Sequence, residues 1–381
     1  MNWQTLLRTL LLIVAWLLSS TVTARAGGAV AYSLESQPHA DIWRLQIVRG
    51  EVELALVLRP GDAVRDVTRA GGRDRGALHL VGDVESSAGS WARVSVDPNG
   101  RWLSGLVRTG DALFSVQTRR SGVVWMEQVA TGQPRSVSVS RVLPLAAVVD
   151  SLYDEASDGQ GRRRAIALIN QVDGLFREQL GLALDLRAVR VIEDPTRDPL
   201  RQSGGTLEDV LMAFRNYRQS DTTLPDGVGL VHLFSGASLF DRRVGLAYTS
   251  GVCDPYGHDV SVSRLRMELI TVAHELAHIL GASHDSSWAC GESNLLMAAT
   301  VRSDLSLQMS ACSVDAISPT LDRECFVQLG DPANPIADAA QTLEARPGLR
   351  SLEGAVPTEP VSPLVLLAIA FMAVGLIRRR H

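Results

Sequence analysis

The chain has 381 residues, 46% of them hydrophobic, so it is long enough for two or three folded units and apolar enough to give them cores. Its formal net charge is −5, and the three arginines near its C-terminus are too few to indicate nucleic-acid binding. The sequence indicates no particular oligomeric state.

The N-terminus has the pattern of a secretory signal peptide. An apolar run from Leu10 to Leu18 follows Arg8, and residues 24–26 (Ala-Arg-Ala) supply the small residues of a cleavage site. Residues 1–26 are therefore predicted to direct export and to be removed. An uncleaved membrane anchor is the alternative.

Residues 27–143 contain short runs of Val, Thr and Leu, separated by Gly-Asp, Pro-Asn-Gly and Thr-Gly turns. This pattern predicts a small β-rich unit. Its clearest element is a hairpin in which residues 91–96 pair with the strand beginning at Trp102, across a turn at 98–100.

Strands and helices alternate through residues 144–330, which predicts an α/β domain with a mostly parallel, mixed sheet. Thr206 should cap the second helix. Strands are predicted at 146–150, 186–193, 229–234 and 244–248, and helices at 162–180, 206–218 and about 264–280.

The C-terminal 51 residues have a different composition from the rest of the chain. Residues 331–360 carry five prolines and few large apolar side chains, which is typical of a linker. Residues 361–381 contain an uncharged run, 364–377, followed by three arginines. The run is shorter than the roughly 20 residues of a spanning helix. A membrane anchor and a removable surface-sorting signal both remain open.

The most informative stretch is residues 274–285, His-Glu-Leu-Ala-His-Ile-Leu-Gly-Ala-Ser-His-Asp. His274 and His278 lie one turn apart on the same face of a helix, where both can bind one metal ion. Gly281 can end that helix and let the chain return His284 as a third ligand. Three imidazoles leave the fourth zinc position open, as in catalytic sites, and Glu275 can accept a proton there.

This interpretation has two alternatives. The two histidines could lie on a solvated helix face, but their neighbours are apolar around nearly the whole helix, and buried histidines need partners. Glu292 could replace His284 as the third ligand. The adjacent Gly281 and Asp285 favour His284.

The pattern H-E-x-x-H-x-x-G-x-x-H, followed by residues 294–298 (Asn-Leu-Leu-Met-Ala) as a methionine turn, resembles the metzincin zinc proteases. Asp285 and the segments 231–236 and 244–253 resemble the adamalysin (reprolysin) branch, over about residues 144–326. Segments 79–95 and 103–107 are similar to the propeptides of that branch. Unlike the animal members, this sequence shows no disintegrin-like or cysteine-rich region, no cysteine before the methionine turn and none in residues 27–143.

The resemblance implies a metzincin catalytic domain at 144–330, preceded by a β-rich propeptide at 27–143. It implies that Met297 is the apolar floor under the zinc and not a ligand. The edge strand with Gly245, Leu246 and Ala247 would pair with an extended peptide, small Gly245 letting its backbone approach. Ala298 would begin the wall of the primed-side pocket.

The four cysteines in an exported chain predict two disulfides. Residue spacing alone allows three pairings, and the family resemblance implies Cys253–Cys325 and Cys290–Cys312. A cysteine-ligated structural zinc is disfavoured because the spacings are wide and irregular.

The resemblance leaves open a calcium site in addition to the catalytic zinc, of the kind that some relatives carry. Asp150, Asp254 and Asp259 are its candidate ligands, although no EF-hand loop is present. His232 and His258 are expected not to bind metal.

These features predict a secreted or surface-anchored zinc endopeptidase that cleaves extracellular proteins or peptides, with Glu275 as general base. An inactive surface-adhesion module of the same fold is the alternative. Because residues 27–143 lack cysteine, the expected propeptide cannot use a thiol switch. It is expected to aid folding and to block the cleft by bulk, with cleavage near 135–144; His79 or Asp83 reaching the zinc is the alternative.

Overall fold

The structure is a computed structural model that describes residues 27–37, 41–64, 77–97, 99, 101–119, 121–131, 137–201, 205–285, 294–302 and 304–329. The predicted signal peptide, linker and C-terminal hydrophobic segment lie outside these residues. Within the described part of the chain, no helix has both the length and the apolarity needed to cross a membrane.

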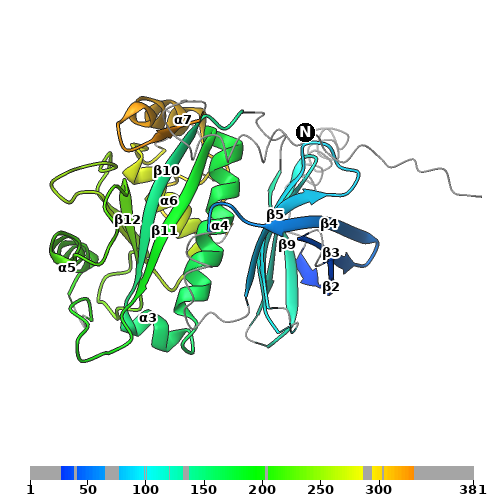
Figure 1. Cartoon of the computed structure of the whole chain (residues 1–381), viewed down its shortest axis with the longest axis horizontal. Coiled ribbons are helices and arrows are strands. Elements are labelled where there is room, and N and C mark those ends of the chain that lie inside the picture. The colour runs from blue at the N-terminus through cyan, green and yellow to red at the C-terminus, as the bar shows by residue number, and fades with distance from the viewer. Residues whose placement is uncertain are drawn as a thin grey trace, which may run out of the picture. The chain divides into compact units, whose positions relative to one another are not determined.

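Residues 27–131 form one antiparallel sheet of nine strands, in the order β1-β9-β8-β7-β6-β5-β4-β3-β2 (Figure 1). The predicted hairpin is confirmed, since β6 and β7 pair from Trp91↔Arg108 to Val96↔Leu103. The sequence thus predicts the β-rich character of this unit, and its role as a propeptide stays a prediction. The strands are β1 (Gly27–Ala29), β2 (Ala31–Gln37), β3 (Ile42–Arg49), β4 (Val52–Pro60), β5 (Leu78–Val84), β6 (Trp91–Val96), β7 (Leu103–Thr109), β8 (Ala112–Thr118) and β9 (Val124–Thr131).

The second half of the chain is an α/β domain around a six-stranded sheet. The order is β11-β10-β12-β14-β13, in which the pairs β10–β11, β10–β12 and β12–β14 are parallel. β13 and β15 pair antiparallel with β14 and β10. The strands are β10 (Arg141–Val149), β11 (Leu182–Val191), β12 (Leu230–Ser235), β13 (Gly245–Ala247), β14 (Val260–Arg264) and β15 (Val327–Gln328).

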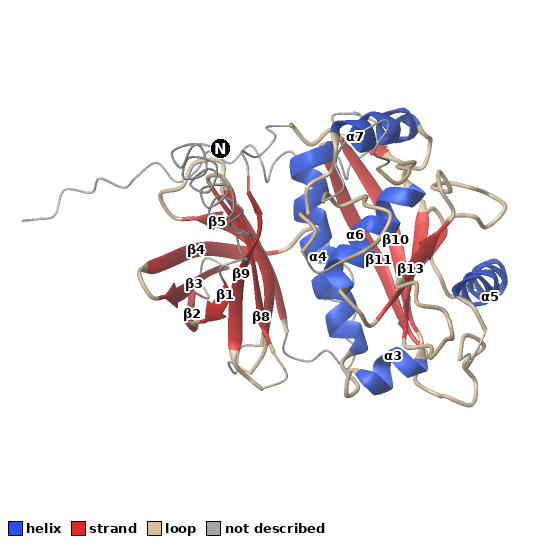
Figure 2. Cartoon of the chain, turned by 180° about the vertical axis from the view of Figure 1, so that it is seen from behind, coloured by secondary structure: helices blue, strands red, loops and turns tan. Residues whose placement is uncertain are grey.

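Helices cover both faces of this sheet (Figures 1 and 2). One apolar core joins α4 and α6 to residues of β10 and β11, and a second core joins α5 to the opposite face. The cap of α5 is the predicted one: Thr206 accepts from the Asp209 backbone N–H, and Asp209 accepts from the Thr206 backbone N–H. The helices are α3 (Ser151–Ala156), α4 (Gly161–Leu180), α5 (Leu207–Ser220), α6 (Glu268–Ile279), α7 (Ala311–Ile317) and the 3₁₀ turn η1 (Ser318–Asp322).

Several elements differ from the expectations: the sequence did not indicate α3, α7, β14 or β15, and β10 and β11 begin five and four residues before their predicted starts. β14 was not predicted because its Val-Ser-Val-Ser sequence places serines, not apolar residues, on one buried face. Those serines have a partner, since the buried His232 ring lies within hydrogen-bond distance of Ser261 Oγ (2.7 Å) and Ser263 Oγ (2.9 Å). The predicted helix start near Arg264 is wrong by four residues, because Arg264 still belongs to β14 and Met267 has φ of 49° just before α6.

Helix α4 is buried on nearly all sides, and the nine-stranded sheet supplies part of its cover. Arg93 on β6 pairs with Asp173 at 3.0 Å, and Arg108 on β7 pairs with Glu178 at 2.7 Å. Trp91 Nε1–H also donates to Glu178, at 2.7 Å. Residues of both halves share one apolar core. The β-rich unit is therefore joined to the α/β half by buried contacts.

Candidate metal centre

The buried helix α6 carries the first two histidines. His274 and His278 are one turn apart, and the helix between them contributes Leu276 and Ala277 to the core. The chain then turns at Gly281, whose φ of 118° is accessible to glycine but rarely to other residues. This turn returns His284 to the other two rings, as the sequence predicts.

The three imidazoles face one another through their Nε2 atoms. His284 Nε2 lies 3.2 Å from His274 Nε2 and 3.1 Å from His278 Nε2. The opposite nitrogens of the α6 histidines are engaged, because His274 Nδ1–H donates to Leu296 O and His278 Nδ1–H donates to Ala282 O, both at 2.7 Å. A carbonyl only accepts, so both Nε2 atoms present lone pairs to the same point.

Burial keeps these rings in the neutral form that binds metal. Desolvation lowers the pKa of His274 to about 3, assisted by His278 and His284. Desolvation also lowers the pKa values of His278 and His284. Convergent nitrogen lone pairs repel one another unless a cation lies between them, and three neutral imidazoles suit zinc better than calcium, which takes oxygen ligands. The residues present therefore fit a zinc ion. Within the described residues, these three are the group that could hold a metal ion.

Glu275 lies on the same helix, with its carboxyl group against strand β13. Only 4% of its surface is exposed. Burial raises the pKa of Glu275 to about 8, and a cation held by the neighbouring histidines would lower it again. The structure therefore keeps this carboxyl group in a dry environment, next to the metal ligands and the sheet edge.

The loop after the third histidine forms the base of the site. Met297 is fully buried, and its carbonyl accepts from Asp285 N–H at 2.8 Å. Asp285 Oδ1 in turn accepts from the hydroxyls of Ser310 and Ser313, at 2.6 and 3.0 Å. These contacts join His284, the methionine turn and the start of α7.

Leu296, Ser310 and Ser313 were not anticipated as supporting residues. The role of Leu296 uses only its backbone carbonyl, which side-chain patterns do not report. The sequence could have indicated Ser310 as a helix N-cap, because its hydroxyl accepts from Ser313 N–H at the start of α7. Its bond to Asp285, 25 residues away, depends on the fold.

The expected substrate edge is present as strand β13. Gly245, Leu246 and Ala247 pair on one side with β14, and β13 ends the strand order of the sheet. All three residues are partly exposed. Ala298, one residue beyond Met297, is nearly buried and pairs with Asp285 as an isolated parallel bridge.

The structure contains the Cys253–Cys325 disulfide. Cys312 is disulfide-bonded as well, and Cys290, its expected partner, lies outside the described residues. The two disulfides thus belong to the α/β half, on the C-terminal side of β12.

The three candidate calcium ligands do not form one cluster, because Asp150 lies at α3 while Asp254 and Asp259 line a pocket elsewhere, and each has a protein partner. Asp150 caps α3 and accepts from Ser235 and Gly236. Asp254 pairs with His258 at 3.0 Å, and Asp259 pairs with Arg218 at 3.4 Å. As expected, His232 and His258 have protein partners and lie outside the triad.

His79 is also engaged away from the triad. It is buried in β5, where its Nδ1 lies 2.7 Å from Ser95 Oγ on the adjacent strand. Asp83 lies on the same strand, opposite Val57 of β4. The alternative that His79 blocks the zinc is therefore wrong in this structure.

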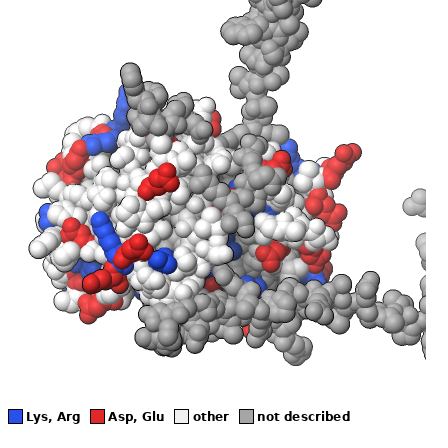
Figure 3. Space-filling view, turned by 90° about the horizontal axis from the view of Figure 1, so that it is seen from above, with Lys and Arg blue, Asp and Glu red and all other residues white. Residues whose placement is uncertain are grey.

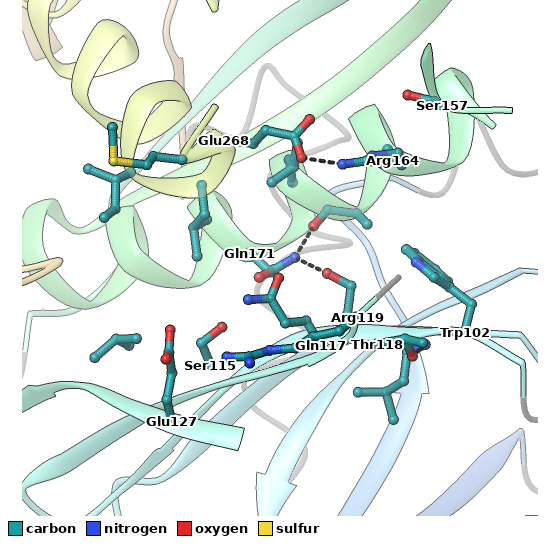
Figure 4. A pocket seen from close by; sticks show the side chains of 18 of the residues that line it. Trp102, Ser115, Gln117, Thr118, Arg119, Glu127, Ser157, Arg164, Gln171 and Glu268 are labelled. Atoms are coloured by element: carbon teal, nitrogen blue, oxygen red, sulfur yellow. Dashed lines mark hydrogen bonds and ion pairs between the residues drawn. The ribbon is translucent and has the colours of Figure 1, made fainter. Parts of the chain in front are cut away.

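A cavity of about 500 Å³ lies between the β-rich sheet and the start of α6, and it is not part of the metal centre (Figure 4). Arg164 pairs with Glu268 at one side, and Gln171 donates to Ser104 Oγ at 3.1 Å across it. None of the histidines of the triad lines it.

On the face shown in Figure 3, acidic and basic side chains are interspersed among uncharged ones.

Comparisons with known proteins found the following similarities. The model described as Metallo-peptidase family M12 matches residues 139–314. Snake venom metalloproteinase fibrolase of Macrovipera lebetinus is 38% identical over 161 residues, which are 39% of this chain and 74% of that protein. Trimerelysin-2 of Protobothrops flavoviridis is 26% identical over 184 residues, 45% of this chain and 88% of that protein. The crystal structure of metalloproteinase-II from Bacteroides fragilis aligns with 80% of this chain and 95% of its own, at 12% identity and a TM-score of 0.46.

Proposed function

This chain belongs to metallopeptidase family M12 and is a zinc metalloendopeptidase, and we propose that His274, His278 and His284 hold its zinc while Glu275 acts as general base. The observation that carries the proposal is the convergence of three neutral Nε2 atoms beside one buried carboxyl group.

The roles of the residues follow from their positions. Zinc bound here would supply Lewis acidity toward the attacking water and the scissile carbonyl. Glu275 would accept the proton of the attacking water and pass it to the leaving amine. The position of Glu275 favours this transfer, because its carboxyl group is buried on the same helix turn as two of the metal ligands.

We propose that an extended peptide binds along β13. The strand offers backbone groups of Gly245, Leu246 and Ala247 on the edge opposite to β14. Ala298 would begin the wall of the primed-side pocket, because it follows the methionine turn. Backbone pairing of this kind gives affinity for peptides in general, and the pocket walls give the selectivity.

Export is part of the proposal. The family resemblance to secreted venom enzymes, the sequence of residues 1–26 and the Cys253–Cys325 disulfide all fit an oxidising compartment. We propose extracellular proteins or peptides as the substrates, and either an anchor or a sorting signal at residues 361–381.

We propose that the β-rich unit assists folding. It covers α4 through buried ion pairs and a shared core. We also keep as a proposal that it blocks the cleft by bulk, which these contacts with α4 do not test.

The purified full-length protein tests the proposal. Metal analysis should find about one zinc per chain, and a peptide library should be cleaved until a chelator is added. Glu275→Gln should retain zinc and lose at least ~100-fold in kcat, the usual scale for a general base. Near wild-type turnover of Glu275→Gln would refute the mechanism, and a wild-type chain with zinc but without cleavage would favour a binding module.

A further inference from the structure

Gly245, the first residue of β13, lies directly against the side chain of Glu275. A Cβ atom added to Gly245 would stand 2.6 Å from Glu275 Cγ and 2.7 Å from Glu275 Cδ, with Oε1 closer still. Real Cβ atoms essentially never approach other heavy atoms within 3.0 Å. Any residue larger than glycine would therefore displace one of the two partners.

The backbones on both sides of this contact are held in place. Gly245 is registered opposite Ser263 of β14. Glu275 lies in the middle of α6, between the buried His274 and Leu276. The His274 ring is bonded to Leu296 O as well. Because both backbones are held, the clash would be relieved by a rotation of the Glu275 side chain.

We propose that Gly245 is a positioning residue for Glu275: its bare backbone is the surface against which the carboxylate rests beside the metal ligands. This rests on the proposed function of Glu275 as the base. It differs from the expectation that Gly245 makes room for the substrate backbone. The same short strand would thus align the peptide and set the position of the base.

The two roles for Gly245 affect different kinetic constants. If Gly245 only admits the substrate, then Gly245→Ala raises KM with kcat unchanged. If Gly245 positions Glu275, then kcat falls while KM changes little, because the base acts in the transition state. A displacement of about 1 Å in a reacting group can cost about 100-fold in rate.

The first experiment measures kcat and KM for the full-length protein and for Gly245→Ala, Glu275→Ala and the double variant. We expect Gly245→Ala to lower kcat by about 100-fold with KM within about threefold. In the Glu275→Ala background both Cγ and Cδ are absent, so Gly245→Ala should change the residual kcat by less than about threefold. Equal losses in both backgrounds, or a change in KM alone, would overturn the proposal. Gly28→Ala in β1 is the control, because its added Cβ meets the movable Arg49 side chain at 3.1 Å.

A second experiment needs no catalytic activity and therefore separates this inference from the proposed function. Thermal unfolding is compared for Gly245→Ala and Gly245→Ala/Glu275→Ala, each against its parent. The overpacked variant should lose several degrees in Tm in the wild-type background and less than about 1 °C once the Glu275 side chain is removed. If Gly245→Ala fails to fold, recovery of folding in the double variant supports the contact. The same loss in both backgrounds would place the clash elsewhere and would exclude the proposal.

Discussion

The ring of His274 donates its Nδ1–H to the carbonyl of Leu296 at 2.7 Å, one residue before the buried Met297. The loop of the methionine turn therefore sets both the tautomer and the orientation of a metal ligand. Hydrogen-bond partners of this kind commonly affect metal affinity by 10–100-fold. The packing of Met297 is thus linked to zinc binding without any bond from its sulfur to the metal.

Truncation of Met297 should weaken both the fold and the metal site. Met297→Ala leaves a cavity in the core and should cost about 2–5 kcal/mol in the free energy of unfolding. The zinc Kd, measured against a competing chelator, should rise because Leu296 is no longer held in place. Met297→Leu keeps most of the volume and is the matched control. A normal zinc Kd in Met297→Ala would contradict the link.

The third metal ligand can be identified by zinc content. His284→Ala removes one of the three convergent Nε2 atoms, so its zinc occupancy after dialysis should fall well below that of the wild-type protein. Glu292→Ala should keep full occupancy. The reverse outcome would assign the ligand to Glu292 and contradict the triad.

The Cys253–Cys325 disulfide closes a loop with a sequence separation of 72 residues. The double variant Cys253→Ser/Cys325→Ser should lose roughly 2–5 kcal/mol in the free energy of unfolding, as expected for a loop of this length. Denaturant unfolding measures the loss, and peptide mapping without reductant checks the pairing. Recovery of Cys253 joined to Cys290 would show that the assigned pairing is wrong.

The ion pair between Arg108 and Glu178 is almost completely buried, with side-chain exposures of 5% and 6%. Glu178→Gln should therefore cost about 3–5 kcal/mol, because it leaves the Arg108 charge buried without its counterion. The exposed pair of Arg44 and Glu85 provides the control, and Glu85→Gln should cost at most about 1 kcal/mol. Equal small losses in the two variants would show that the β-rich unit is weakly attached in solution.

The buried His232 should make stability depend on pH. Burial lowers its pKa from 6.5 to about 3, so the unfolded chain binds a proton that the folded chain does not. The stabilisation is present above pH 6.5 and is lost as pH falls toward 3, by about 2 kcal/mol between pH 8 and pH 5. Asp150, whose pKa burial raises to about 6, acts in the opposite direction, so the test is a comparison of slopes. His232→Gln should lower the slope of unfolding free energy against pH in this window; an unchanged slope would contradict the assignment.

The histidine motif could be read from the sequence because its geometry is local. Two residues four apart on a helix share a face, and one glycine returns the third ligand within six residues. The predicted cap at Thr206 and the hairpin at residues 91–103 were correct for the same reason. Local rules decide such elements, and the structure confirms them.

The features missed from the sequence depend on distant partners. The serines of β14 look like a polar loop until His232 from β12 is placed beside them. The contact of Gly245 with Glu275 joins residues 30 positions apart. It indicates a role for this glycine in placing Glu275, where the sequence suggested only room for the substrate backbone. The aspartates considered for calcium have protein partners that composition could not indicate: Asp150 caps α3, Asp254 pairs with His258 and Asp259 pairs with Arg218.

The packing of the β-rich sheet against α4 determines which fragment of this protein can fold stably by itself. Asp173 and Glu178 take their arginine partners from β6 and β7, and the apolar core under the helix includes Leu106 and Leu113. A fragment beginning at residue 137 would expose that apolar side of α4 to water and would be prone to aggregation. A nick between residues 131 and 137 should therefore yield two pieces that migrate together on a sizing column. In this architecture, cutting the chain and releasing the N-terminal sheet are separate events, because the second must also break the buried ion pairs and the shared core.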